Sequence, residues 1–269
     1  MRKHRPLGSG RLDHTGYIVA ELERSMRWLA DVLAATSVGP AVSIPGTEIR
    51  VGALLLGDFE WEIVEHPEAR ERPVRLADDA LGSYHLILET SDLGQAAAHL
   101  SALGVAFEQT ASTLRFSDPD GYTYFAAASH PSHQDAAVPG AFDGGVRSVA
   151  FNVRALSRSQ EWYERWFGLT AAPETGGRIA LLRAGRATLR LRETAAAAAA
   201  QPLTGMGPTH PAIEVQNLEE TEERLERDAA TFLLPLRRDE HEGSRRFGRS
   251  SFFVADPDGL PVQVIGPAE

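Results

Sequence analysis

The sequence contains no cysteine among its 269 residues, which excludes disulfides, thiolate metal sites and a cysteine nucleophile. It is also short of positive charge, because 27 Lys and Arg residues stand against 37 Asp and Glu, for a formal net charge of −10. A protein that binds nucleic acid normally presents a basic surface, so we expect no nucleic-acid partner.

Long hydrophobic runs are missing as well. No apolar stretch approaches the roughly 18 residues of a membrane-spanning helix. The basic segment Met1–Pro6 is not followed by a hydrophobic stretch, which is unlike a secretory signal. We therefore expect a cytoplasmic protein with no membrane partner. The hydrophobic fraction of 43% and the charged fraction of 24% are typical of a folded protein, and the length suits one large domain or two modest ones.

Two recurrences along the chain indicate internal repeats. The tetrapeptide Asp-Pro-Asp-Gly occurs at 118–121 and again at 256–259, each time between two apolar runs, which predicts a strand, a tight turn and a strand. An apolar strand followed by residues at helical spacing begins near residues 12, 83, 146 and 208. Each of these four units therefore predicts a strand, a helix and two or three further strands.

One such unit is too small to bury its own sheet, so we expect the units to combine in pairs. We predict one domain over 11–128 and a second over 146–267. The segment 129–145, rich in Pro, Gly, His and Ala, is predicted to be the linker. Residues 1–10 are predicted to form an N-terminal arm.

These units resemble the vicinal-oxygen-chelate superfamily, which includes glyoxalase I, methylmalonyl-CoA epimerase, extradiol dioxygenases, and the bleomycin and fosfomycin resistance proteins. The resemblance extends from about residue 11 to 266. It is most specific in 12–33, in Leu56–Glu65 and in the two Asp-Pro-Asp-Gly turns. It implies an α+β fold of tandem paired βαβββ modules, in which each pair forms a curved mixed sheet around a cavity with helices outside. It also implies a small-molecule substrate and leaves a homodimer open, but it does not fix one reaction, since this fold hosts many.

The resemblance further implies where a metal would bind. In the metal-binding families, one residue on the first strand and one on the last strand of each module face the metal. In the first predicted domain these positions fall on His14, Glu62, His85 and Phe125. Two imidazoles and a carboxylate are typical ligands of non-haem Fe(II) and also suit Mn, Co, Ni or Zn. We therefore expect one divalent metal, with Fe(II) favoured, held by His14, Glu62 and His85.

In the second predicted domain, the equivalent positions fall on Ser148, Arg190, His210 and Gln263. Arginine does not ligate metals, so we expect these four side chains to approach one another without binding one.

Phe125 departs from the family pattern. In glyoxalase-type and epimerase-type enzymes a glutamate at this position binds the metal and takes part in proton transfer. Proton abstraction still needs a base, and Glu60 and Glu89 are the candidates because strand alternation places them on the faces of Glu62 and His85. Thr123 and Phe125 share a strand face and are expected to line the substrate pocket.

Several functions are compatible with these residues. The first is a metal-dependent enzyme acting on a small oxygenated metabolite, either a non-haem Fe(II)-type oxygenase, which the three ligands favour, or an isomerase, epimerase or lyase that works through a metal-bound enolate. The second is a metal-free binding protein for an aromatic drug or metabolite, as in the resistance proteins. The third is a metal-free catalyst that uses carboxylates of the cavity.

Overall fold

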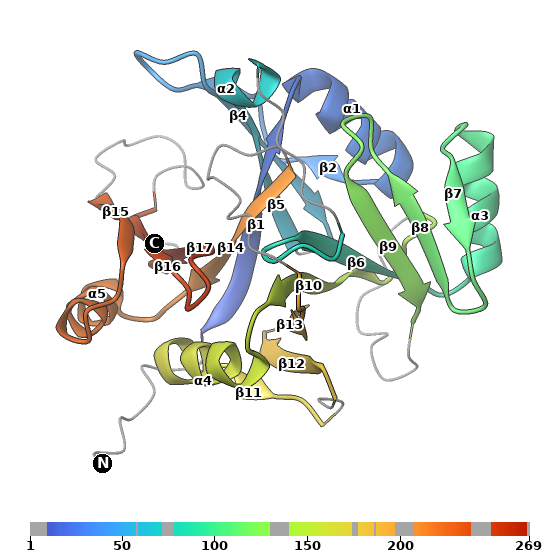
Figure 1. Ribbon diagram of the computed structural model, residues 1–269. Coiled ribbons are helices and arrows are strands. Elements are labelled where there is room, and N and C mark those ends of the chain that lie inside the picture. The colour runs from blue at the N-terminus through green and yellow to red at the C-terminus, as the bar shows by residue number, and fades with distance from the viewer. Residues whose placement is uncertain are drawn as a thin grey trace.

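The computed structural model of the protein describes residues 10–57, 59–71, 78–129, 140–173, 177–185, 187–196, 207–237 and 249–267. Most of the predicted linker and nearly all of the predicted N-terminal arm lie outside these ranges. The described residues form two mixed β-sheets with helices packed outside them (Figure 1), which confirms the predicted α+β class. Among them, no helix combines the length and the apolar character that crossing a membrane requires.

The four predicted units are all present, and we call them modules 1 to 4. Module 1 contains β1 (Arg11–Val19), α1 (Leu22–Leu33), β2 (Thr36–Ser37), β3 (Val42–Ser43), β4 (Arg50–Leu56), β5 (Phe59–Glu65) and the short α2 (Pro67–Glu71). Module 2 contains β6 (Tyr84–Thr90), α3 (Leu93–Ala102), β7 (Phe107–Gln109), β8 (Thr113–Ser117) and β9 (Thr123–Ala128).

The second half of the chain repeats this order. Module 3 contains β10 (Gly145–Val153), α4 (Leu156–Phe167), β11 (Thr170–Ala171), β12 (Ile179–Ala184) and β13 (Ala187–Glu193). Module 4 contains β14 (Gly207–Glu214), α5 (Leu218–Arg227), β15 (Phe232–Arg237), β16 (Ser251–Ala255) and β17 (Pro261–Ile265).

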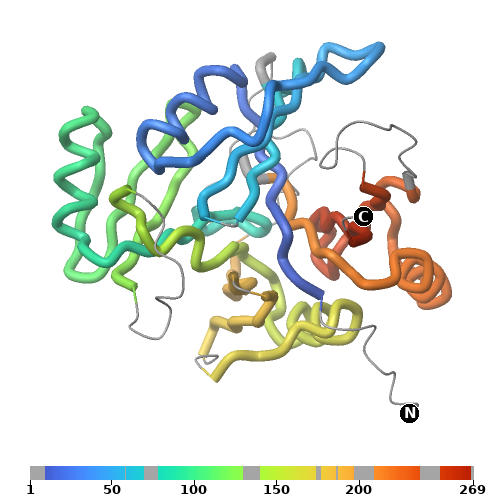
Figure 2. The backbone as a smooth tube through the Cα atoms, turned by 180° about the vertical axis from the view of Figure 1, so that it is seen from behind, coloured from blue at the N-terminus to red at the C-terminus, as the bar shows by residue number. Residues whose placement is uncertain are grey.

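The modules do not pair in the order that the sequence suggested. The first sheet runs β15-β16-β17-β14-β1-β5-β4-β2 and the second runs β11-β12-β13-β10-β6-β9-β8-β7. Module 1 therefore shares a sheet with module 4, and module 2 with module 3, whereas we expected consecutive modules to pair. Antiparallel contacts between β1 and β14 and between β10 and β6 join the partners. In Figure 2 the blue first strand and the orange β14 run side by side, although they are far apart in the sequence.

Strand alternation gives each sheet one face against the helices and one open face. On β5, Phe59, Trp61 and Ile63 are buried, whereas Glu60 and Glu62 are half-buried. The apolar side chains pack with those of α1 in one hydrophobic core. The polar side chains project from the opposite face because successive Cβ atoms of a strand point to opposite sides. This alternation presents the candidate ligands on the open face.

The two Asp-Pro-Asp-Gly turns hold consecutive modules together outside the sheets. The carboxylate of Asp120 accepts a hydrogen bond from the backbone N–H of Ala20, just before α1, at 3.1 Å. The carboxylate of Asp258 accepts one from the backbone N–H of Arg154, just before α4, at 2.8 Å. The repeated motif thus has the same role twice, because each turn docks on the start of the preceding module's helix.

Candidate metal centre

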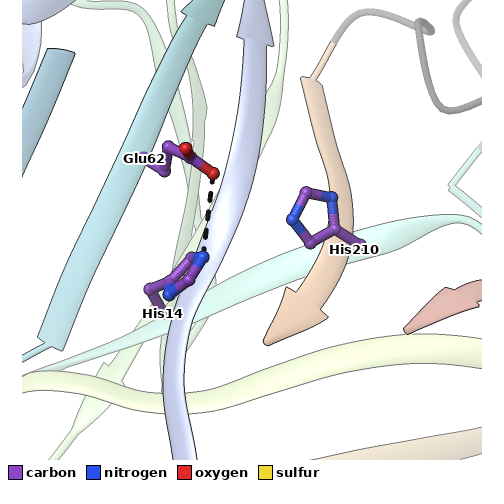
Figure 3. Close-up of side chains that lie close together, drawn as sticks. All are labelled: His14, Glu62 and His210. Atoms are coloured by element: carbon purple, nitrogen blue, oxygen red, sulfur yellow. Dashed lines mark ion pairs between the residues drawn. The ribbon is translucent and has the colours of Figure 1, made fainter. Parts of the chain in front are cut away.

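Three potential metal ligands converge on the open face of the first sheet. They are His14 on β1, Glu62 on β5 and His210 on β14, and each offers a ligand atom within 4.8 Å of those of the other two. Nε2 of His14 lies 3.7 Å from Oε2 of Glu62. Figure 3 shows these two side chains pointing toward each other, with the ring of His210 on the neighbouring strand. The strand register explains the convergence, since Gly16 pairs with Glu62 on one side of β1 and with His210 on the other.

Gln263 on β17 adds a fourth donor. Its Oε1 atom lies 3.0 Å from Nε2 of His14 and 3.2 Å from Nε2 of His210. Two imidazoles, one carboxylate and one amide oxygen therefore surround a common point. A set of nitrogen and oxygen donors with a single negative charge fits a divalent first-row transition metal, so the side chains that are present fit such an ion.

The imidazole of His14 is oriented by a carboxylate behind it. Nδ1 of His14 lies 3.0 Å from Oδ2 of Asp13, and Arg249 forms an ion pair with Asp13 at 3.0 Å. Burial opposes ionisation of Asp13, but His14 and Arg249 outweigh it and lower the pKa of Asp13 to about 2. The ionised carboxylate accepts the Nδ1–H of His14, which leaves Nε2 for a metal, an arrangement common behind metal-binding histidines.

His210 is held in the neutral form that binds metals. Burial, together with the nearby His14, lowers the pKa of His210 to about 3, against a smaller opposing effect of its hydrogen bond with Gln263. Nδ1 of His210 lies 2.9 Å from the hydroxyl oxygen of Thr209, which in turn donates to the carbonyl oxygen of Gly16 at 3.4 Å. Both imidazoles therefore direct Nε2 toward the common point.

The structure brings only two of the three predicted ligands together. His14 and Glu62 are adjacent, but His85 lies on β6 in the other sheet. There its Nε2 is 3.2 Å from the carbonyl oxygen of Asp78, and its ring packs edge-on against Phe125 at 5.4 Å between centroids. The predicted set is corrected accordingly: His210 takes the place of His85, because module 1 pairs with module 4 and not with module 2.

The other predicted site residues are also distributed over the two sheets. Glu60 lies opposite His14 in the β1–β5 register and so shares the open face with the candidate centre, although it is not one of the three converging ligands. Glu89 lies in the second sheet, where it is buried and forms an ion pair with Arg147 at 3.1 Å. Thr123 and Phe125 lie on β9 of the second sheet and do not line the candidate centre.

The group of four expected in the second half of the chain is not assembled either. Ser148 and Arg190 lie in the second sheet, whereas His210 and Gln263 lie in the first. Sequence reasoning thus assigned His210 and Gln263 to a site without metal and assigned no role to Asp13, Thr209 or Gly16. One signal was available: grouping module 1 with module 4 places His14, Glu62, His210 and Gln263 in one site. The other site then keeps His85 as its one good donor, beside Ser148, Arg190 and Phe125.

Comparison with known proteins agrees with this architecture. The family model "Glyoxalase/Bleomycin resistance protein/Dioxygenase superfamily" matches residues 11–124 and 145–264. Glyoxalase I from Zea mays superposes with a TM-score of 0.72 at 17% sequence identity, covering 96% of this chain and 92% of the maize chain. A candidate dioxygenase from Bacillus subtilis superposes with a TM-score of 0.70 at 12% identity, covering 96% of this chain and 86% of the other. At these low identities, the superpositions show a shared fold and no more.

A mutant form of the maize glyoxalase I is a further structural neighbour. It has a TM-score of 0.70 and 19% identity, and the match covers 96% of this chain and 94% of the mutant. No curated protein is significantly similar to this chain in sequence.

Proposed function

Because the chain belongs to the glyoxalase/bleomycin resistance protein/dioxygenase superfamily, we propose that it is a metal-dependent enzyme acting on a small oxygenated metabolite. The ligands are His14, Glu62 and His210, with Gln263 as a weaker fourth donor. The observation that carries this proposal is the convergence of the three ligand atoms within 4.8 Å on an open sheet face. Ionisable side chains seldom gather in a partly buried place unless they are paired or bind a metal.

The donor set favours oxygen chemistry. Two histidines and one carboxylate are the ligands of non-haem Fe(II) oxygenases, and Fe(II) when bound would supply Lewis-acid and redox chemistry. Dioxygen is the oxidant, and both of its atoms enter the product, so no external reductant is consumed. Gln263 contributes a neutral oxygen that takes up no proton at neutral pH. Phe253, whose ring lies 4.8 Å from that of His210 between centroids, gives the site an apolar wall.

A second candidate is an isomerase or lyase of the glyoxalase type. The observation that favours it is Glu60, which shares the open face with Glu62 and pairs in register with His14. A carboxylate beside the substrate can accept a proton from a carbon next to a carbonyl group. This reaction needs no dioxygen, so the two candidates differ in a measurable requirement.

Metal content tests the site itself. The metal-free protein would be reconstituted with Fe(II), Mn(II), Co(II), Ni(II) or Zn(II), and bound metal would be measured by mass spectrometry. We expect one equivalent in the wild type, less than about a tenth of that in His14→Ala and His210→Ala, and one equivalent in the matched control His85→Ala. Well under one equivalent in the wild type with every metal would refute the enzyme proposal and leave a metal-free binding protein.

Dioxygen dependence separates the two reactions. The Fe(II)-loaded protein would be incubated with catechols and with α-hydroxy carbonyl compounds, with and without air. Oxygen uptake that matches loss of a catechol supports the oxygenase. Exchange of a substrate hydrogen for solvent deuterium without air, lost in Glu60→Gln, supports the isomerase or lyase and refutes the oxygenase.

A further inference from the structure

The second sheet carries a counterpart of every position in the candidate metal centre. Gly16 on β1 pairs with Glu62 on β5, and at the same place in the other sheet Ala150 on β10 pairs with Arg190 on β13. Arg190 therefore occupies the position of the carboxylate ligand. By the same comparison of registers, the counterparts of His14, His210 and Gln263 are Ser148, His85 and Phe125.

The guanidinium of Arg190 makes this second set better suited to an anion than to a metal cation. Arg190 is half-buried, and burial, together with the neighbouring Arg147 and Arg192, lowers its pKa. Arg147 has a partner, since it forms an ion pair with Glu89 at 3.1 Å. Among the residues that the structure describes, no carboxylate forms an ion pair with Arg190. A half-buried guanidinium next to two others is stabilised when an anion binds.

Apolar side chains share this open face with Arg190. Leu181 on β12 pairs with Arg190 in the strand register, and Ile87 on β6 pairs with Phe125 on β9. All three apolar side chains are half-buried, so they are neither sealed in the core nor fully hydrated. The hydroxyls of Ser148 and Thr188, 2.7 Å apart, lie beside these side chains, because Ser148 pairs with Thr188 on one side and with Ile87 on the other.

We propose that the open face of the second sheet binds a small organic carboxylate, with Arg190 holding the carboxylate group and Phe125 contacting an apolar or aromatic body. A guanidinium binds a carboxylate through two parallel N–H···O bonds, a geometry that a point charge cannot reproduce. The site is separate from the candidate metal centre, because its residues belong to the other sheet. It holds whether or not the first sheet binds metal.

Calorimetric titration with benzoate tests the proposal. The full-length protein, freed of metal with a chelator so that the first sheet does not compete, is titrated in a buffer with little chloride. We expect benzoate to bind with a Kd below about 1 mM, given the affinity that ligands of this size reach. Benzamide, which has the same shape without the charge, should bind at least tenfold more weakly. Equal binding of the two, or no heat with benzoate, would overturn the proposal.

Variants locate the site. Arg190→Gln should weaken benzoate binding at least tenfold. Arg190→Lys should weaken it by less, because lysine keeps the positive charge but cannot donate two parallel hydrogen bonds to the carboxylate. Arg27→Gln is the matched control, since it removes the same charge from an exposed position on α1, and it should bind like the wild type. His14→Ala should also bind like the wild type. Unchanged binding in a folded Arg190→Gln, checked by circular dichroism, would overturn the assignment, and so would inorganic phosphate binding as tightly as benzoate.

Discussion

Gly16 lies directly beneath the imidazole of His210. A Cβ atom on residue 16 would stand 2.0 Å from Cε1 of that ring, closer than any real contact allows. The ring of His210 can therefore occupy its place on the open face only because residue 16 has no side chain. This close packing of the His210 ring against the backbone of Gly16 is a feature of the candidate centre and not of the hydrophobic core.

Gly16→Ala should therefore weaken metal binding by at least about tenfold, because the ring must turn away and take Nε2 with it. The thermal unfolding temperature of the metal-free protein should change little, since only one side chain of the open face moves. Metal affinity would be measured by competition with a chromogenic chelator. Gly39→Ala is the matched control, because a Cβ there meets nothing within 4 Å. Equal affinities of the two variants would show that the position of His210 does not matter to the metal.

Asp13→Asn should lower metal affinity by about 10–100-fold through His14. The carboxylate of Asp13 fixes the proton on Nδ1 of His14, whereas an amide can present either a donor or an acceptor and no charge. The chelator competition would be repeated for this variant and for Asp31→Asn, an exposed aspartate on α1 that serves as the control. Retention of full affinity by Asp13→Asn would mean that Asp13 serves only its ion pair with Arg249.

Gln263→Glu should tighten metal binding at least tenfold, because a second carboxylate replaces a neutral donor at the same point. If the enzyme is an oxygenase, turnover should fall at the same time, since a firmly bound fourth ligand occupies a position that the substrate or dioxygen needs. Phe125→Glu is the matched control. It introduces the same charge at the counterpart position of the second sheet and should leave metal affinity unchanged. Tighter metal binding in Phe125→Glu would instead mean that the metal lies in the second sheet, beside residue 125.

The sequence was sufficient to predict the modules, because each depends on local patterns. The strand at His14, its helix and the strand at Glu62 follow from alternation and helical spacing within a short segment. The two Asp-Pro-Asp-Gly turns were likewise recognisable as turns. The structure adds that Asp120 and Asp258 hold consecutive modules together, which depends on backbone N–H groups far away in the sequence.

Local sequence patterns could not predict which modules pair. His85 and His210 occupy the same position of equivalent first strands, so alternation alone cannot tell which of them meets His14. The choice depends on contacts between β1 and β14, about 200 residues apart, and local propensity carries no information on such long-range pairing. Only the chemistry of the last strand distinguishes them, since Gln263 can donate an oxygen to a metal and Phe125 cannot.

The pH dependence of stability should report on Asp256, in the second Asp-Pro-Asp-Gly turn. Its Oδ1 accepts backbone hydrogen bonds from Asp258 at 2.8 Å and Leu260 at 2.9 Å, and its Oδ2 lies 3.5 Å from the hydroxyl of Tyr163. Burial nevertheless raises the pKa of Asp256 from 3.8 to about 7. Between these two values the folded chain keeps a proton that the unfolded chain has lost.

Raising the pH from 4 to 7 therefore favours the unfolded state, and the free energy of unfolding should fall by up to about 4 kcal/mol through this group before levelling off. Asp256→Asn keeps an oxygen acceptor for the turn but cannot titrate, so its profile should be flatter than that of the wild type. Urea unfolding of the metal-free proteins at several pH values measures the difference, with Asp31→Asn as the control. Parallel profiles of the wild type and Asp256→Asn would mean that Asp256 is ionised in the folded chain, with the backbone hydrogen bonds of the turn outweighing the cost of burial.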